Sequence, residues 1–147
     1  MLMVDLESRI QKAIEEISGN EALLEMLDTE AAAEMLEWGK SMVTSLVNET
    51  GDMDDEAAQL ALEPRLKAVR QTIRSAGNWA AGAYTDPDDR VQLRDRLLGY
   101  QKVIRGAADA SLPSAEQVDA LLNSMNVAQV TPQQQILNLK ELFNEAR

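Results

Sequence analysis

Apolar side chains recur every three to four residues along almost the whole chain, and this spacing constrains the fold more than any other feature of the sequence. Over residues 2–18, for example, Leu6, Ile10, Ala13 and Ile17 fall on one side of a helix. No segment shows the strict alternation of apolar and polar residues that is typical of a half-buried strand. The pattern therefore predicts an all-α protein without a β-sheet.

Residues that favour helix ends divide this pattern into separate helices. Glycine and proline stop helices, whereas Asp, Asn, Ser and Thr accept hydrogen bonds from the free N–H groups of a first turn. We expect Asp52 and Asp86 to be N-caps, and Ser114 to form a capping box with Gln117. The predicted helices cover residues 2–18, 21–27, 28–48, 52–84, 86–105, 115–124 and 132–147.

The helix predicted over residues 52–84 contains residues that oppose helix formation. Pro64 lacks the N–H group that an inner helical position needs, so we expect it to kink or divide the helix. The apolar spacing continues through Gly77 and Gly82, and we extend the helix to about Tyr84 for that reason. Further along the chain, Thr131 begins a segment that matches a second capping box with a glutamine three residues later.

A chain of 147 residues is long enough to bury about two-thirds of its unfolded surface, so we expect one domain with a substantial core. The predicted fold class is a single-domain irregular or up-and-down helical bundle of five to seven helices over residues 1–147. Hinge-forming residues gather in the segments 106–114 and 123–132. Residues 113–147 are therefore a candidate for a less tightly docked C-terminal helical pair.

The absence of histidine and cysteine excludes several classes of chemistry. Without cysteine, the chain forms no disulfide, no zinc–thiolate site and no iron–sulfur cluster. Without histidine, it lacks the usual general base, the catalytic triad, and the histidine ligands of haem and of di-iron bundles. We expect no catalytic residue, no metal and no cofactor.

The sequence also bears on localisation. Residues 1–7 carry no basic leader, and no window of 18 residues is apolar throughout. We therefore expect a cytoplasmic protein without a membrane span.

Charge is distributed unevenly along the chain, whose formal net charge is −11. Residues 1–63 contain 16 acidic and 3 basic residues, whereas residues 64–105 contain 9 basic and 4 acidic residues. Two stripes with helical spacing lie in the basic segment, one formed by Lys67, Arg70 and Arg74 and the other by Arg90, Arg94 and Arg105. If their helices are antiparallel neighbours, the stripes merge into a patch for an acidic partner, RNA or the chain's own acidic segment. The acidic total disfavours nucleic acid.

Four carboxylates form a pattern that suits magnesium. Glu34 and Glu37 lie three residues apart, and so do Glu49 and Asp52. The E-x-x-E…E-x-x-D arrangement resembles that of the all-α nucleoside-triphosphate pyrophosphohydrolases, in which carboxylates of two helices hold magnesium beside a phosphate chain. This resemblance implies a magnesium-dependent nucleotide pyrophosphohydrolase. The alternative interpretation is a solvated helix face, because Glu34 and Glu37 lie on the polar side of their helix.

Small residues surround Trp79 in the segment 75–83. Small side chains allow a second helix or a ligand to approach the backbone closely. The segment predicts a tight helix crossing, and a small-molecule pocket beside Trp79 and Tyr84 is the alternative. Trp79 is also a candidate partner contact, together with the two basic stripes.

These observations favour a protein that contacts other macromolecules over one that breaks bonds. The apolar arc of residues 28–48 covers about half the circumference of a helix, and any part that the bundle leaves uncovered needs a partner. Acidic and basic surfaces on one chain suit two-fold or head-to-tail association. The leading hypothesis is a non-enzymatic protein–protein interaction, adaptor or regulatory module that forms a homodimer. The alternatives are the pyrophosphohydrolase, and RNA or anionic-surface binding through the arginine stripes of residues 65–105.

Overall fold

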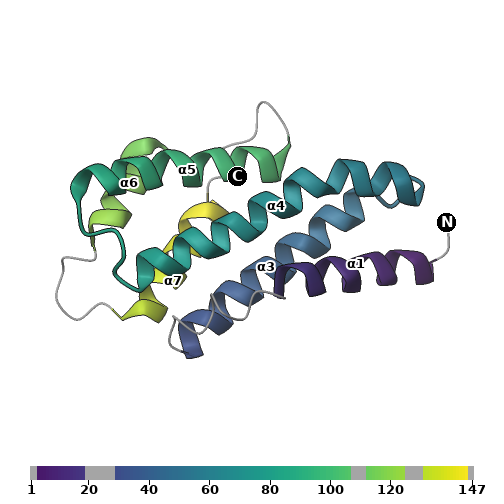
Figure 1. Ribbon diagram of the computed structural model, residues 1–147, viewed down its shortest axis with the longest axis horizontal. Helices are drawn as coiled ribbons and strands as arrows, with labels where there is room; N and C mark the ends of the chain where they lie inside the picture. Colours follow the sequence, from purple (N-terminus) through teal and green to yellow (C-terminus); the bar gives the residue numbers. More distant parts are fainter. Residues whose placement is uncertain (1–2, 19–28, 107–111, 125–130, 146–147) are drawn as a thin grey trace.

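The protein is an all-α helical bundle (Figure 1). The computed structural model describes residues 3–18, 29–106, 112–124 and 131–145, and helices make up 86% of these residues. The helices are α1 (Met3–Ser18), α3 (Thr29–Glu49), α4 (Asp55–Ala80), α5 (Pro87–Arg105), α6 (Ala115–Asn123) and α7 (Pro132–Glu145). No strand occurs in the described ranges, so the predicted fold class is confirmed. The helix predicted over residues 21–27 lies outside them.

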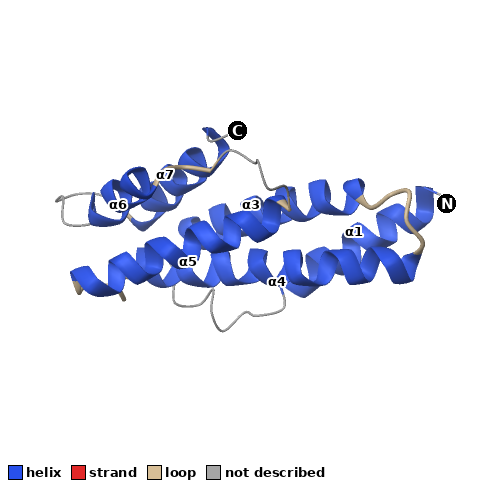
Figure 2. Ribbon diagram, turned by 90° about the horizontal axis from the view of Figure 1, so that it is seen from above, coloured by secondary structure: helices blue, strands red, loops and turns tan. Residues whose placement is uncertain are grey.

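The long helices α1, α3, α4 and α5 form the body of the bundle, and the shorter α6 and α7 lie together on one side of it (Figure 2). Helix α4 packs on both α3 and α5, while α1 packs chiefly on α3. The last helix, α7, packs on α3 and α4, and α6 packs on α5 and α7. No helix in the described part of the chain is long and apolar enough to cross a membrane.

One hydrophobic core joins all six helices. Each helix contributes side chains that are at most 4% exposed, among them Ile17 of α1, Val43 of α3, Val69 of α4, Leu97 of α5, Leu122 of α6 and Leu139 of α7. Burial of one such side chain stabilises a fold by about 1.5 to 3 kcal/mol. Because residues of α6 and α7 belong to this same cluster, the C-terminal helices are held by the shared core.

At Gly39, side chains of α1 and α4 pack closely against the backbone of α3. A Cβ atom at this position of α3 would lie 2.9 Å from the Cδ1 atoms of both Ile17 in α1 and Ile73 in α4. Real Cβ atoms essentially never approach other atoms so closely, so a side chain at position 39 would require both isoleucine side chains to shift.

Several helix ends lie where the sequence predicts them. Asp86 caps α5 and accepts a hydrogen bond from the N–H of Asp88 at 2.9 Å. Gly106 ends that helix with a φ of 69°, a left-handed conformation that glycine adopts at no steric cost. Ser114 and Gln117 form the predicted capping box of α6, each side chain accepting from the other residue's backbone N–H.

Other helix ends correct the prediction. The N-cap of α4 is Asp54 and not Asp52, because the Asp54 carboxylate accepts from the N–H of Ala57 at 2.8 Å. At α7 the hydroxyl of Thr131 accepts from the N–H of Gln134 at 3.1 Å. The Gln134 side chain donates instead to Asn138 at 2.9 Å, so the described hydrogen bonds form only half of the predicted box.

The extension of α4 to Tyr84 is wrong, since the helix ends at Ala80. Gly82 has a φ of 88°, and its N–H donates to the carbonyl of Trp79 at 3.0 Å. The N–H of Ala83 donates to the carbonyl of Asn78 at 3.0 Å, which completes a Schellman motif. Gly82 is thus the stop signal that the continuing small residues obscured.

Helix α4 runs through Pro64 without division, contrary to one of the two expectations for this residue. Leu62 and Leu66, on either side of the proline, are each only 6% exposed and pack into the core. Their burial holds both halves of α4 in one helix, although Pro64 cannot donate to the carbonyl of Leu60. Pro64 and Leu60 are both exposed, so water can solvate the free carbonyl.

We predict that Pro64→Ala stabilises the protein, because it restores a helical hydrogen bond in a helix that is already continuous. The free energy of unfolding, measured by chemical denaturation, should rise by about 1 to 3 kcal/mol. Gln59→Ala, at an exposed position of the same helix, is the matched control and should change it by no more than about 0.5 kcal/mol. A loss of stability in Pro64→Ala would contradict this account.

Candidate functional site

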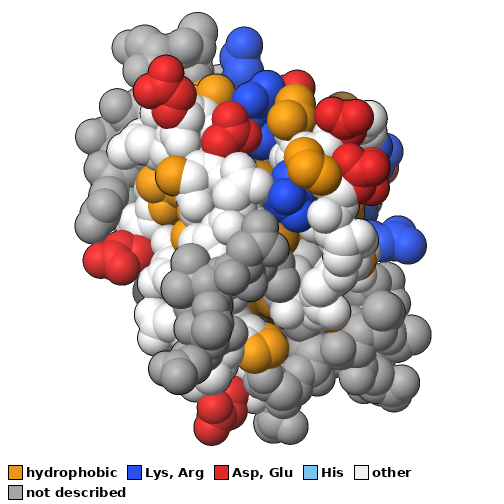
Figure 3. Space-filling view, turned by 90° about the vertical axis from the view of Figure 1, so that its left-hand side faces the viewer, with side chains coloured by type: hydrophobic (Ala, Val, Ile, Leu, Met, Phe, Trp, Pro, Cys, Tyr) orange, Lys and Arg blue, Asp and Glu red, His pale blue; other side chains and the backbone are white. Residues whose placement is uncertain are grey.

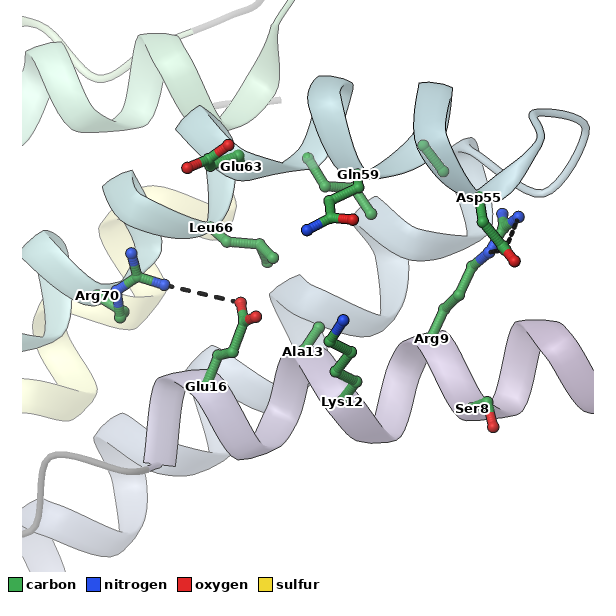
Figure 4. A pocket seen from close by; sticks show the side chains of 12 residues that line it. Ser8, Arg9, Lys12, Ala13, Glu16, Asp55, Gln59, Glu63, Leu66 and Arg70 are labelled. Atoms are coloured by element: carbon green, nitrogen blue, oxygen red, sulfur yellow. Dashed lines mark hydrogen bonds and ion pairs between the residues drawn. The ribbon is translucent and has the colours of Figure 1, made fainter.

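A groove of about 450 Å³ runs between α1 and α4 (Figure 4). Its apolar lining consists of Ala13 from α1 and of Ala58, Leu62 and Leu66 from α4, each at most 6% exposed. Two alanines in the floor leave room because their side chains end at Cβ. The groove is thus an open, partly apolar trough between two helices that lie side by side.

Two ion pairs cross the groove near its ends (Figure 4). Near one end Arg9 of α1 contacts Asp55 of α4 at 2.6 Å. Near the other end Arg70 of α4 lies 3.9 Å from Glu16 of α1. Between them Lys12 extends from α1 toward α4, and it forms no ion pair with any described residue. The centre of the groove therefore carries an available positive charge above apolar side chains.

Arg9 holds one wall of the groove in place. Its guanidinium donates to the carbonyl oxygens of Thr50 at 3.2 Å and Met53 at 3.0 Å, in the turn that joins α3 to α4. It also donates through Nε and Nη2 to Oδ1 of Asp55 at 2.9 and 2.6 Å. The Arg9 side chain is 12% exposed, whereas that of Asp55 is 83% exposed. The contact with the carbonyl of Thr50 is thus better shielded from solvent than the ion pair, whereas the contact with Met53 is exposed.

Arg65 makes a similar contact elsewhere in the bundle. Its Nε atom donates to the carbonyl of Ile104 at 2.7 Å, in the last turn of α5. Its Nη1 atom binds the carboxylate of Glu49 at 2.7 Å, at the end of α3. One side chain of α4 therefore ties down the ends of two neighbouring helices.

A second cavity, of about 590 Å³, lies among α3, α7 and the end of α5. Trp38 contributes to its lining, and the buried Nε1 atom of this side chain has no hydrogen-bond partner. Its cations are engaged, as Arg65 binds Glu49 and Lys140 binds the carboxylate of Glu34 at 2.7 Å. With these cations already paired, Glu37 is a charged residue of the lining that forms no ion pair with a described residue.

The stripe on α5 faces the C-terminal helices. Arg90 donates to Asn123 of α6 at 2.7 Å and to two carbonyls of the preceding turn. Arg94 binds Asp119 of α6 at 2.9 Å and its neighbour Asp95 at 3.0 Å. Hydrogen bonds to Asp119 first, and then to Asp95, raise the pKa of Arg94 above its ordinary value. These two arginines act as internal contacts between α5 and α6.

The remaining basic residues are divided between different neighbours. Arg105 of α5 donates to the carbonyl of Phe143 in α7 at 2.7 Å, whereas Arg70 of α4 faces α1. Lys67 and Arg74 are exposed on α4 and pair with no described residue. The two stripes therefore do not merge into one patch. At the end of the bundle shown in Figure 3, basic and acidic side chains lie beside one another.

Trp79, which the sequence analysis named as a candidate partner contact, is fully buried. Its Nε1 atom donates to the carbonyl of Leu122 in α6 at 3.1 Å, which joins α4 to α6. The two cavities described above are lined by other residues. In this structure Trp79 is part of the core, out of reach of a partner.

The four carboxylates of the magnesium hypothesis do not converge. Glu34 binds Lys140 and Glu49 binds Arg65, so these two acids face different basic partners. Glu37 and Asp52 are both exposed, the first on α3 and the second in the turn that follows it. Within the described ranges no group of three or more acidic side chains is placed to hold a metal ion. The pyrophosphohydrolase hypothesis thus lacks its metal-binding geometry here.

No family model, no curated protein and no solved structure matches this chain. The geometry of the described residues is therefore the basis for any proposal about function.

Three of the basic residues that shape these surfaces were not singled out from the sequence, although a signal for them exists. Arg9, Arg65 and Lys140 each occupy a position of helical register that otherwise belongs to the buried face. Arg65, for example, lies three residues after Leu62 and four before Val69, both of which are buried. A cation in such a position indicates an internal contact.

We predict that Arg9→Met destabilises the protein far more than Asp55→Asn. The methionine keeps the apolar stem but removes the charged hydrogen bonds to two carbonyls of the α3–α4 turn, one of them part-buried, which should cost about 2 to 3 kcal/mol in the free energy of unfolding. Loss of the exposed carboxylate in Asp55→Asn should cost no more than about 1 kcal/mol. Chemical denaturation of both variants provides the measurement. Equal losses would show that the ion pair, and not the carbonyl contacts, fixes this turn.

Proposed function

We propose that this protein is a non-enzymatic protein–protein interaction module whose α1–α4 groove binds a helix of a partner protein. The observation that carries the proposal is the pairing of an apolar floor with a charged rim in one open groove. Amphipathic helices bind such grooves by placing apolar residues at intervals of three and four into the floor. Polar residues at the rim then set orientation and specificity.

The dimensions and charges of the groove indicate which helix it suits. Ala13 and Ala58 in the floor allow the backbone of a docked helix to approach closely, and Leu62 and Leu66 offer contact to larger apolar side chains. Lys12 pairs with no described residue and stands at the centre of the rim. The preferred partner is therefore an amphipathic helix with an acidic residue beside its apolar stripe.

The contacts of the other charged residues support an interaction role over a catalytic one. The acids Glu34, Glu49 and Asp119 each bind a basic side chain of a different helix, and these pairs hold the bundle together. RNA or anionic-surface binding through the arginine stripes is less favoured, because the arginines of α5 are turned to α6 and α7. Homodimer formation and a cytoplasmic location stay predictions.

Site-specific photo-crosslinking in the native host tests this proposal. A photoreactive amino acid at Gln59, on the rim of the groove, should form a discrete covalent adduct with a protein partner. The same amino acid at Gln92, an exposed position on α5, is the matched control and should not form that adduct. Mass spectrometry of the adduct identifies the crosslinked peptide, which should be an acidic amphipathic helix.

A charge reversal then shows whether the adduct depends on the groove. Lys12→Glu should lower the yield at Gln59 about fivefold, the change in affinity that about 1 kcal/mol produces. Lys40→Glu alters the net charge equally at an exposed position of α3 and should leave the yield unchanged. The proposal fails if Gln59 and Gln92 give the same adducts, or if both reversals act alike.

A further inference from the structure

The outer face of α4 carries a regular stripe of residues, all of which are exposed except the half-buried Arg70. They follow one another at intervals of four, three, four, three and four, which keeps them on one side of the helix. Leu60 within the stripe is 68% exposed, the most exposed of the large apolar side chains in the described residues. We call this surface the α4 stripe, and it consists of Glu56, Leu60, Glu63, Lys67, Arg70 and Arg74.

The charges of the α4 stripe are largely unused within the chain. Glu56, Glu63, Lys67 and Arg74 form no ion pair with any described residue. Arg70 has only the long contact of 3.9 Å to Glu16. The buried-face cations described above are all paired, so the stripe differs from them in leaving most of its charges without a partner among the described residues.

Two copies of the α4 stripe are complementary in charge when their helices run antiparallel. The acidic residues of the stripe precede residue 65 and its basic residues follow it, at matching intervals. In an antiparallel pair of α4 helices, Glu63 therefore stands opposite Lys67, and Glu56 opposite Arg74. Leu60 stands opposite the aliphatic stem of Arg70, against which an apolar side chain can pack. Each contact occurs twice, once on each side of a two-fold axis near residue 65.

We propose that a second copy of this chain docks antiparallel on the α4 stripe and forms a two-fold dimer. The helix dipole explains acids only in the first turn of α4, which includes Glu56, and its effect fades within one turn. It does not account for Glu63 and Lys67 in the middle of the helix. Ion pairs between two copies give all four charges a partner, and salt weakens such a dimer.

This dimer goes beyond the groove proposal and does not depend on it. The two surfaces share only Glu63 and Arg70, at the rim of the groove. Lys12, which the groove proposal requires, lies outside the α4 stripe. Lys12→Glu should therefore leave the dimer intact, so that failure of one proposal is distinguishable from failure of the other.

Two charge-reversed variants of the full chain test the dimer. In Lys67→Glu/Arg74→Glu the stripe has only acidic charges apart from Arg70, and in Glu56→Lys/Glu63→Lys it has only basic ones. Each variant alone should dimerise at least about tenfold more weakly than the native chain at low ionic strength, because like charges face each other. An equimolar mixture should recover association as a heterodimer. Sedimentation equilibrium measures the dissociation constant of the native chain, of each variant and of the mixture.

A matched control distinguishes the loss of the ion pairs between the two stripes from the effect of a changed net charge. Arg96→Glu/Lys102→Glu changes the net charge by the same amount as Lys67→Glu/Arg74→Glu, at exposed positions of α5. This control should dimerise like the native chain. A native chain that is monomeric at low ionic strength overturns the proposal. So does a mixture that fails to associate, or a control that dissociates as the acidic variant does.

Spin labels measure the register directly, and the chain contains no native cysteine that would compete for the label. Labels are attached to Gln59→Cys in one sample and Asn78→Cys in another, positions of α4 that are not among the stripe's contacts. With an axis near residue 65 and packed helices, the two Cα atoms should lie about 20 Å apart at position 59 and about 40 Å apart at position 78. A parallel pair would give equal distances at both positions. Equal distances, or no coupling, overturn the antiparallel dimer.

Discussion

Arginine side chains that donate to main-chain carbonyl groups fix how the helices of this bundle meet. Arg9 reaches the turn after α3, Arg65 reaches the last turn of α5, and Arg105 reaches the last turn of α7. Carbonyl groups at a helix C-terminus lack partners within the helix and carry partial negative charge, so a guanidinium is well suited to them. Apolar burial has no direction, whereas these hydrogen bonds have one. The core supplies the stability, and the arginines set the register of one helix against the next.

Much of the fold was predictable because its signals are local. Apolar spacing identified the helices, and short motifs such as Asp86-Pro87 and Ser114 with Gln117 gave correct starts. The errors in the predicted helix boundaries arose where a local sequence signal and the packing or apolar spacing around it favour different structures. Pro64 predicts a kink or a division of the helix, and burial of leucines on both sides keeps α4 undivided. Gly82 ends α4, although the apolar spacing continues past it.

The candidate site was less predictable, because it is formed by two helices that are distant in sequence. Ala13 and Ala58 are ordinary helix-forming residues when each is considered alone. They become the floor of a groove only because the fold places α1 beside α4. The basic stripes were visible in the sequence, yet the sequence did not show that α5 turns its arginines inward while α4 exposes Lys67 and Arg74.

The choice of arginine for the internal contacts has a consequence for how the molecule responds to its surroundings. A guanidinium keeps its proton at every pH that a cell reaches. The chain also contains no histidine and no cysteine, the side chains that most often change charge near neutrality. The arginine contacts to main-chain carbonyl groups therefore keep their charge when a compartment is acidified. Dissolved ions, which screen exposed charges, are the variable to which such a surface is sensitive.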